Sequence, residues 1–358
     1  MNVNELVQKF ISHAPDFYSD LKIGDLDNKH SDIVKSAYDS IETGKAFKDK
    51  NFRNWSAQSD LEVPMQLSTF NFKTHGFLYT VLKFFYVKIF RRDVEKAALT
   101  NILDDISIIK AINGEKLLKE NPAHTASGAS TAYFTDDKSV NLRLLRYTYI
   151  CQNIINHNLL SNSGVWVDVG SYYGGCQNLL YKKFPNVTNV LVDFHHQLCR
   201  SYIFLSQSFP DANHILPDEV SNYENLDSIP KGSFVYLPVS DYYKIENQQV
   251  SLVSNFFSLG EMRREFHSTY MNSSLFKKSK KTYLINRWIS SPFFEKTYDT
   301  DISILDYMSN TQKIDYFDMF PMHHYQLMKR EIHGRVAQRS KGSSYFEMMT
   351  SRKNNLST

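Results

Sequence analysis

The stretch VWVDVGSYYGG, residues 165–175, determines the fold that we predict for this chain. An apolar run ends near Asp168, and a turn that contains Gly170 and Gly174 leads into the next segment. Glycines allow a tight turn, and the start of a helix carries backbone N–H groups that have no partner within the helix. A second apolar run, NVLVDF, then ends close to Asp193. This order predicts a strand, a turn, a helix and a second strand parallel to the first.

The same alternation continues towards the C-terminus. Short apolar runs bounded by turn residues predict strands, and apolar residues at three-to-four spacing predict helices. The predicted strands are 165–169, 190–194, 214–216, 234–237, 251–256 and 282–286. The predicted helices are 175–184, 198–209 and 262–275. This pattern predicts parallel pairing with helices on both faces, so the expected fold class is α/β with a doubly wound, Rossmann-like sheet.

The residues before this α/β region have a different, mostly helical pattern. Apolar residues recur at helical spacing through 33–38, 77–90, 97–109 and 142–155. The stretch 121–137 collects Pro, Gly, Ser, Thr and Asp, which predicts a loop that either connects two helices or has a function of its own. We therefore predict a helical region at 1–160, an α/β domain at 161–340 and a polar, fraying tail at 341–358.

The composition is that of an ordinary folded protein. Of 358 residues, 42% are hydrophobic and 22% are charged, which excludes a mostly disordered or fibrous chain. A formal net charge of +3 is too small to indicate a nucleic-acid-binding protein. Three widely spaced cysteines indicate reduced thiols rather than a disulfide framework. Because of the small net charge we expect no nucleic-acid partner. The N-terminus shows no signal-peptide pattern, so we expect a cytoplasmic protein.

One apolar segment, GFLYTVLKFFYVKIF at 76–90, bears on the question of a membrane. As a helix it reaches about 22 Å, which is short of a hydrocarbon core of about 30 Å. Lys83 and Lys88 also interrupt it. We expect a buried helix and no transmembrane span. The alternative is peripheral contact, in which the helix lies on a membrane surface with Arg91 and Arg92 at the headgroups.

The turn after the first predicted strand suits a cofactor that contains a nucleoside. Ligands of doubly wound sheets bind at the carboxyl ends of the strands, where an acidic residue placed like Asp193 holds ribose hydroxyls. The dinucleotide pattern Gly-x-Gly-x-x-Gly is absent after Gly170. S-adenosylmethionine is the other candidate, because Asp168, Gly170 and Gly174 match its acidic and glycine positions, with Tyr172 in place of the middle glycine. A strand–turn–helix without any ligand remains the alternative.

Four motifs carry a family resemblance: VDVGSYYGG, LVDFHHQLCRSYIFLSQSFP, SLVSNFFSLGEM and KTYLINRW. Through them, residues 165–285 resemble the bacterial sugar O-methyltransferases of polysaccharide biosynthesis clusters. The positions that match the family pattern are Asp168, Gly170, Gly174, Gly175, Asp193, Asn255, Ser258, Glu261, Met262, Leu284, Asn286 and Arg287. Two departures concern the cofactor: Ser171 and Tyr172 replace family glycines, and His195–His196 replace an apolar or acidic continuation.

The resemblance implies transfer of a methyl group from S-adenosylmethionine to a sugar hydroxyl during the biosynthesis of a surface polysaccharide. It also implies a Rossmann-like methyltransferase sheet and an N-terminal region that shapes the acceptor site. From the turn, the end of the second strand and the resemblance together, the predicted cofactor-binding residues are Asp168, Gly170, Ser171, Tyr172, Gly174, Gly175, Asp193, Phe194, His195, Asn255 and Ser258. The acceptor is a sugar or glycan that is free, nucleotide-linked or lipid-linked. Two alternatives stay open: a methyltransferase of a non-sugar small molecule, and a methyltransferase-like protein that binds partners without catalysis.

Two residues are candidates for the base that removes the hydroxyl proton, a role best performed by a group whose pKa lies near the working pH. Glu261 follows the fourth main strand at the rim where the methyl group should point. Its alternative role is a negative charge at the start of the predicted helix 262–275. His267, six residues on, lies on another face of that helix and is more simply a surface or core histidine.

The acceptor side is less well defined by the sequence. Arg287, after the strand 282–286, is a candidate for holding an acidic sugar or a phosphate, or else an ion-pair partner. His124 in the loop 121–137 and Arg143 on the next helix are further substrate-binding candidates. Arg143 shares a helix face with Arg146, and such a pair is more often a solvated face. We expect no metal, because neighbours such as His323 and His324 point in opposite directions on a strand.

Overall fold

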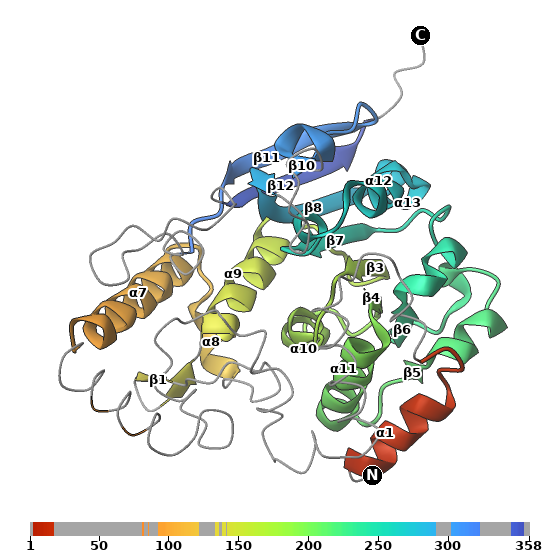
Figure 1. Cartoon of the computed structure of the whole chain (residues 1–358), viewed down its shortest axis with the longest axis horizontal. Helices are drawn as coiled ribbons and strands as arrows, with labels where there is room; N and C mark the ends of the chain where they lie inside the picture. The colour runs from red at the N-terminus through yellow and green to blue at the C-terminus, as the bar shows by residue number, and fades with distance from the viewer. Residues whose placement is uncertain are drawn as a thin grey trace. The chain divides into compact units, whose positions relative to one another are not determined.

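An eight-stranded sheet organises the larger part of this computed structural model, which describes residues 3–17, 81, 85, 92–121, 133–135, 138–140, 142–290, 302–322 and 345–353 (Figure 1). The strand order is β11-β12-β8-β7-β3-β4-β6-β5. The bounds are β3 Gly164–Val169, β4 Val187–Asp193, β5 His214–Ile215, β6 Phe234–Pro238, β7 Leu252–Phe256, β8 Lys281–Arg287, β11 Gln312–Met319 and β12 Tyr345–Arg352. The six strands from β5 to β8 are parallel, while β12 runs antiparallel to both β8 and β11.

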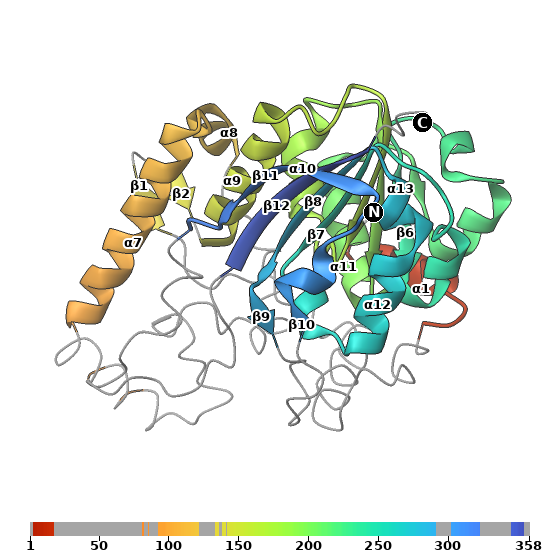
Figure 2. The same ribbon diagram turned by 90° about the horizontal axis from the view of Figure 1, so that it is seen from above.

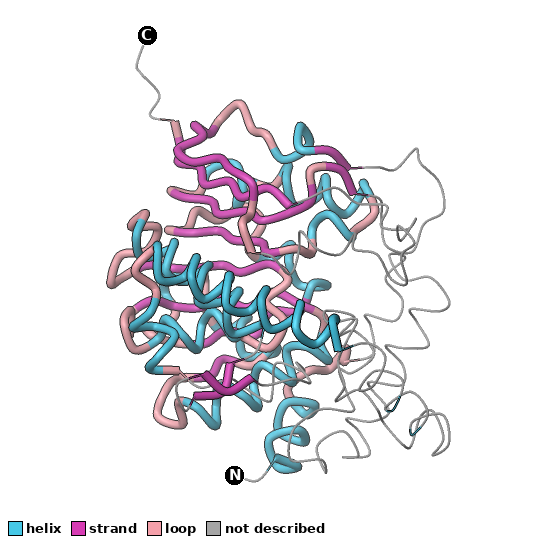
Figure 3. Tube along the Cα trace, turned by 90° about the vertical axis from the view of Figure 1, so that its left-hand side faces the viewer, coloured by secondary structure: helices cyan, strands magenta, loops and turns pink. Residues whose placement is uncertain are grey.

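Helices cover both faces of this sheet. They are α10 Gly175–Tyr181, α11 His195–Ser208, α12 Arg264–Asn272 and α13 Ser274–Lys278. The chain passes from β3 to β4 to β6 in one direction and then returns to β7 and β8 on the other side of β3. Right-handed crossovers therefore put α10 and α11 on one face and α12 and α13 on the other (Figure 2). The predicted doubly wound α/β fold is confirmed, and Figure 3 shows its strands side by side.

The central strands form where they do because the sheet buries both of their faces. Every residue of β4, VTNVLVD, is buried, as are all but the first residue of β3. Parallel strands covered on both faces are typically runs of β-branched residues of this kind. The core includes Val167, Val190 and Val253 from the strands, with Leu275 from α13 packed against them. The carboxyl ends of β3, β4 and β7 are thus held in register.

The predicted fraying of the tail 341–358 is wrong, because its residues 345–352 form β12, which lies inside the sheet between β8 and β11. Its first six residues are buried. The charge of Glu347 made this stretch look polar, but the hydroxyl of Tyr283 on β8 donates a hydrogen bond to that carboxylate. Pairing with β8 and β11, both distant in sequence, is not visible in the local pattern.

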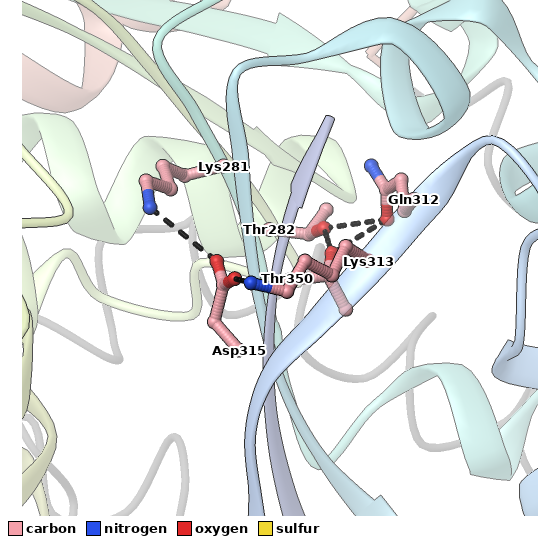
Figure 4. Close-up of polar contacts among 6 residues, drawn as sticks. All are labelled: Lys281, Thr282, Gln312, Lys313, Asp315 and Thr350. Atoms are coloured by element: carbon pink, nitrogen blue, oxygen red, sulfur yellow. Dashed lines mark hydrogen bonds and ion pairs between the residues drawn. The ribbon is translucent and has the colours of Figure 1, made fainter. Parts of the chain in front are cut away.

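Hydrogen bonds and ion pairs between polar side chains link the strands at the antiparallel end of the sheet (Figure 4). The hydroxyls of Thr282 on β8 and Thr350 on β12 both donate to Oε1 of Gln312 on β11, at 2.8 and 2.6 Å. Asp315 lies at the bulge in β11 and forms an ion pair with Lys281, whose Nζ is 3.4 Å from Oδ2 of Asp315. Three strands are thereby linked by side chains as well as by their backbones.

The helix α1, Val3–Ser12, belongs to the same unit as the sheet. The ring of Phe10 lies 5.9 Å from that of Tyr202 on α11 and 6.3 Å from that of Tyr236 on β6. His13 contacts the carboxylate of Asp218 at 3.0 Å. The first helix therefore packs with the α/β elements, although the sequence analysis grouped it with the helical region.

The chain divides into two units. The first contains Met1–Gly44, Ile154–Phe320 and Lys329–Thr358, and the second contains Lys45–Asn153 and Pro321–Met328. The elements of the second unit are α7 Arg92–Ala111, α8 Glu115–Glu120, β1 Tyr133–Thr135, β2 Lys138–Val140 and most of α9, Leu142–Asn156. The predicted helices at 97–109 and 142–155 are confirmed, whereas β1 is a strand within the predicted loop 121–137. The predicted boundaries at 160 and 340 stay predictions.

Two features of the sequence bear on the environment of the protein. None of the three cysteines forms a disulfide, in agreement with the predicted reduced thiols. No helix in the described ranges is long and apolar enough to cross a bilayer. The predicted helix 33–38 and all of the segment 76–90 except Val81 and Phe85 lie outside the described residues, so peripheral membrane contact stays a prediction.

Candidate cofactor site

The turn between β3 and α10 has a backbone that few sequences can adopt. Gly170, Tyr172 and Gly174 all have positive φ angles, of 77°, 54° and 78°. At Gly170 the neighbouring chain also leaves no room for a side chain, because a Cβ there would lie 2.1 Å from the Oγ of Ser258. The amide of Gly170 donates to the carbonyl of Val192 on β4 at 2.7 Å. The turn is therefore fixed against both neighbouring strands at their carboxyl ends.

Asp193, the last residue of β4, ties the two strand ends together. Its Oδ2 accepts the backbone N–H of Tyr172 at 2.7 Å, and its Oδ1 accepts that of Phe194 at 2.8 Å. Carboxylate oxygens also accept hydrogen bonds from hydroxyl groups such as those of a ribose. The predicted acidic residue thus lies directly beside the glycine turn, as a ribose-binding role requires.

The side chain of Tyr172 is held by α11. The Cζ atom of Arg200 lies 4.5 Å from the centre of the Tyr172 ring, and the hydroxyl of Ser201 donates to the Tyr172 carbonyl at 2.5 Å. Arg200 itself is 1% exposed. Tyr172 therefore lines the turn with its backbone while its ring packs against α11.

Buried polar atoms in this region that form no hydrogen bond with any described residue include Oγ of Ser171 in the turn and Oε1 of Gln177 on α10. A buried polar atom without a partner is costly, and in native proteins it commonly has a ligand, water or functional role. The site therefore retains hydrogen-bonding capacity that the described residues do not satisfy.

Asp168 lies beneath the turn rather than on its surface. Ser254 on β7 donates to its Oδ1 at 2.6 Å, and the amide of Gln177 donates to its Oδ2 at 2.8 Å. Burial raises the pKa of Asp168 to about 6, although both hydrogen bonds oppose the shift. Since the side chain is 3% exposed, Asp168 supports the turn from below, and its role in binding a cofactor, directly or through water, stays a prediction.

Asn255 and Ser258 build the neighbouring rim. The amide of Asn255 donates to the carbonyl of Val169 at 2.7 Å and to Oγ of Ser258 at 2.6 Å. Its Oδ1 accepts the backbone N–H of Leu259 at 3.1 Å and the amide of Asn286 at 3.0 Å. Asn255, Ser258 and Asn286, which match the family pattern, thus connect the ends of β3, β7 and β8. They also fix the position of the short helix η8, Leu259–Glu261.

Glu261, the last residue of η8, is exposed and lies near Arg287 at the end of β8. Burial alone disfavours the charged guanidinium, but Tyr345 and Glu261 outweigh that effect and raise the pKa of Arg287. Nε of Arg287 donates to the Tyr345 hydroxyl at 2.9 Å. The ring of Phe257, which is half-buried, packs at 5.4 Å from that of Tyr345. This cluster combines a carboxylate, a guanidinium and aromatic surface at the rim.

The predicted helix 262–275 is instead two helices, and His267 lies in the first of them, α12. Its ring is 1% exposed and packs 4.7 Å from that of Tyr307. Burial lowers the pKa of His267 to about 4, while Asp306 opposes and Arg264 reinforces the shift. The ring is therefore neutral at physiological pH and packed in the core, which favours the structural alternative for this residue.

The residues that follow Asp193 form an aromatic cluster at the start of α11. Phe194 stacks on His196 with ring centres 5.9 Å apart, and the ring of His195 lies 5.9 Å from that of Phe17. Phe17, Arg200 and Gln177 are members of this site that sequence reasoning missed. Phe17 is far away in sequence, Gln177 lies outside the positions that match the family pattern, and Arg200 lies within a family-like motif but is not one of its matching positions.

The remaining predicted residues lie in the second unit or outside the described residues. Arg143 and Arg146 lie on α9 in the second unit, and both are buried, at 8% and 3% exposure, so the solvated face that the sequence favoured is wrong. His124, His323 and His324 lie outside the described residues. Within the described ranges, no group of three or more His, Cys, Asp or Glu could hold a metal ion, and metal independence stays a prediction.

Comparisons with known proteins add a likeness of fold. No family model and no curated protein matches the chain. A candidate RNA methyltransferase from Pyrococcus horikoshii is 12% identical, with 68% of this chain and 98% of that chain covered and a TM-score of 0.37. A candidate sarcosine dimethylglycine methyltransferase from Galdieria sulphuraria is 12% identical, with 62% and 91% covered and a TM-score of 0.39. Coclaurine N-methyltransferase, bound to N-methylheliamine and SAH, is 10% identical, with 66% and 78% covered and a TM-score of 0.38. These values do not assign an activity.

Proposed function

We propose that this protein is an S-adenosylmethionine-dependent methyltransferase that acts on a sugar hydroxyl. The observation that carries the proposal is the contact between Asp193 and the backbone of Tyr172. It puts a ribose-binding carboxylate beside a tight turn at the carboxyl ends of adjacent parallel strands, where nucleoside ligands bind in such sheets. The absence of Gly-x-Gly-x-x-Gly argues against a dinucleotide.

The residues at the turn fit this cofactor. The carboxylate of Asp193 lies at the end of β4 beside the turn, and the buried Oγ of Ser171, which bonds to no described residue, can donate to the carboxylate of the methionine end. The ring of Tyr172 packs on Arg200, which leaves the turn lined by backbone. When bound, S-adenosylmethionine supplies an electrophilic methyl group on a sulfonium centre.

The protein's own contribution to the reaction is alignment of the acceptor and removal of one proton. Glu261 is the base that accepts the proton of the acceptor hydroxyl, because it is an exposed carboxylate at the rim. Arg287 and the half-buried ring of Phe257 offer hydrogen-bond donors and an apolar face to the acceptor. The four motifs shared with the bacterial sugar O-methyltransferases support a sugar, as part of a surface polysaccharide, as that acceptor.

The test is calorimetric titration of the purified protein with S-adenosylhomocysteine. We expect a dissociation constant on the order of micromolar and, for Asp193→Ala, a loss of at least about tenfold, because two ligand acceptors and the tie to the turn are removed. Asp211→Ala, a change at an exposed carboxylate, is the matched control. Absence of binding to the folded wild-type protein would contradict the proposal and favour a methyltransferase-like binding protein. A second assay then identifies the class of acceptor. It measures the transfer of labelled methyl groups from S-adenosylmethionine to sugars and compares it with transfer to non-sugar small molecules.

A further inference from the structure

Tyr172 has a backbone conformation that favours glycine. Its φ of 54° is in the left-handed region, which is disfavoured for residues with a Cβ, and the resembled family has glycine at this position. Such a conformation persists only where the surroundings determine it. We propose that Tyr172 and Arg200 form a clamp that holds the turn in its ligand-ready shape, so that both are positioning residues of the cofactor site. This inference rests on the proposed function.

Three contacts fix Tyr172, each to a different group. Its N–H donates to Asp193 at 2.7 Å, its carbonyl accepts from Ser201, and its ring lies under the guanidinium of Arg200 at 4.5 Å. Two of these partners belong to α11, which begins two residues after Asp193. The position of Tyr172 within the turn therefore follows that of α11, while Gly170 and Gly174 supply the other two positive φ angles.

The pairing of Arg200 with Tyr172 is strong because it is buried. Arg200 is 1% exposed, and a cation over an aromatic ring is attracted more strongly when water is excluded. The guanidinium also lies 5.9 Å from the ring of Tyr173, so one arginine holds two successive residues of the turn. A planar guanidinium can stack in this way, whereas a lysine ammonium cannot.

The clamp determines which groups face a ligand. Ser171 precedes Tyr172, and its Oγ is buried without a described partner. If Tyr172 is fixed, Ser171 and the backbone between Gly170 and Gly174 are ordered before the cofactor binds. A site that is preorganised in this way loses less conformational entropy on binding, which raises affinity.

The test compares affinities for S-adenosylhomocysteine by calorimetry at a temperature well below the melting point of each variant. Tyr172→Gly restores the family residue and relieves the backbone, yet we expect its dissociation constant to rise about fivefold or more because the ring contact is lost. Tyr172→Phe keeps the ring and should bind close to wild type. Arg200→Lys should weaken binding, and the double variant Tyr172→Gly/Arg200→Lys should bind no more weakly than Tyr172→Gly alone.

The outcomes separate this inference from the proposed function. If Tyr172→Gly binds as tightly as wild type or more tightly, the clamp is overturned while the cofactor assignment stands. A lower melting temperature of Tyr172→Gly with unchanged affinity also overturns it, because the tyrosine would then be only structural. If the wild-type protein binds no S-adenosylhomocysteine, the proposed function fails and the clamp with it.

Discussion

Asp168 shows how one buried side chain can make stability depend on pH. Its pKa of about 6 in the folded protein is higher than the usual value of 3.8, because burial disfavours the charged form. Between about pH 4 and pH 6 the unfolded chain therefore holds this proton less well than the folded protein does. The contribution of Asp168 to the free energy of unfolding should fall as pH rises through that interval, by up to about 3 kcal/mol, and stay level above it.

Asp168→Asn should remove this dependence. An asparagine cannot ionise, and its amide can donate to Oε1 of Gln177, which bonds to no described residue, if the Gln177 amide rotates. We expect the variant to be more stable than wild type above pH 6 and similar to it near pH 4. Urea denaturation at several pH values checks this, with the exposed Asp211→Asn as control. Parallel pH profiles for wild type and Asp168→Asn would contradict the assignment.

At the scale of elements, β12 is the strand on which the antiparallel end of the sheet depends. It pairs with β8 over Tyr345–Ser351 and with β11 over Phe346–Arg352. A chain that ends at residue 344 loses both ladders, and the side-chain link through Thr350 as well. We expect such a chain to show no cooperative thermal unfolding by circular dichroism. A chain that ends at Lys353 keeps β12 and is the control, and a cooperative transition in the shorter chain would show that β12 is dispensable.

The strands that local pattern predicted are those buried on both faces. The runs at β3, β4, β6, β7 and β8 are apolar, short and bounded by turn residues, so their type follows from neighbours in sequence. β11 and β12 carry charges and polar residues, and they exist because each finds a partner far along the chain. Local pattern contains no information about such partners.

In the candidate site, too, some features follow from the sequence and others depend on tertiary packing. The position of Asp193 beside the glycine turn follows from parallel pairing, because the carboxyl ends of β3 and β4 must meet. The packing of Arg200 on Tyr172 depends on how α11 lies against the turn, which no spacing rule describes. The burial of His267 and Arg146 likewise depends on tertiary packing rather than on helical periodicity.

At the scale of the whole molecule, the α/β unit is assembled from separate parts of the chain. α1 contributes Phe10, whose ring is fully buried against Tyr202 and Tyr236. Phe10→Ala should lower the free energy of unfolding by about 3–5 kcal/mol, because it leaves a cavity between α1, α11 and β6. Lys9→Ala, one residue away and exposed, should change it by less than about 0.5 kcal/mol.

Urea denaturation, monitored by circular dichroism, measures both variants. A small loss for Phe10→Ala, similar to that for Lys9→Ala, would mean that α1 is loosely attached and that the α/β unit is stable without it.

The place of β12 in the sheet has a consequence for biosynthesis. A ribosome completes β8 and β11 before it makes β12, yet β12 must lie between them. Until β12 has been synthesised, the edge of β8 therefore exposes unpaired backbone groups beside a partly formed core, a state that is prone to aggregation. Closure of the sheet must therefore wait for the last of its strands to be synthesised, and the yield of folded protein in a cell should respond to chaperones that protect that edge.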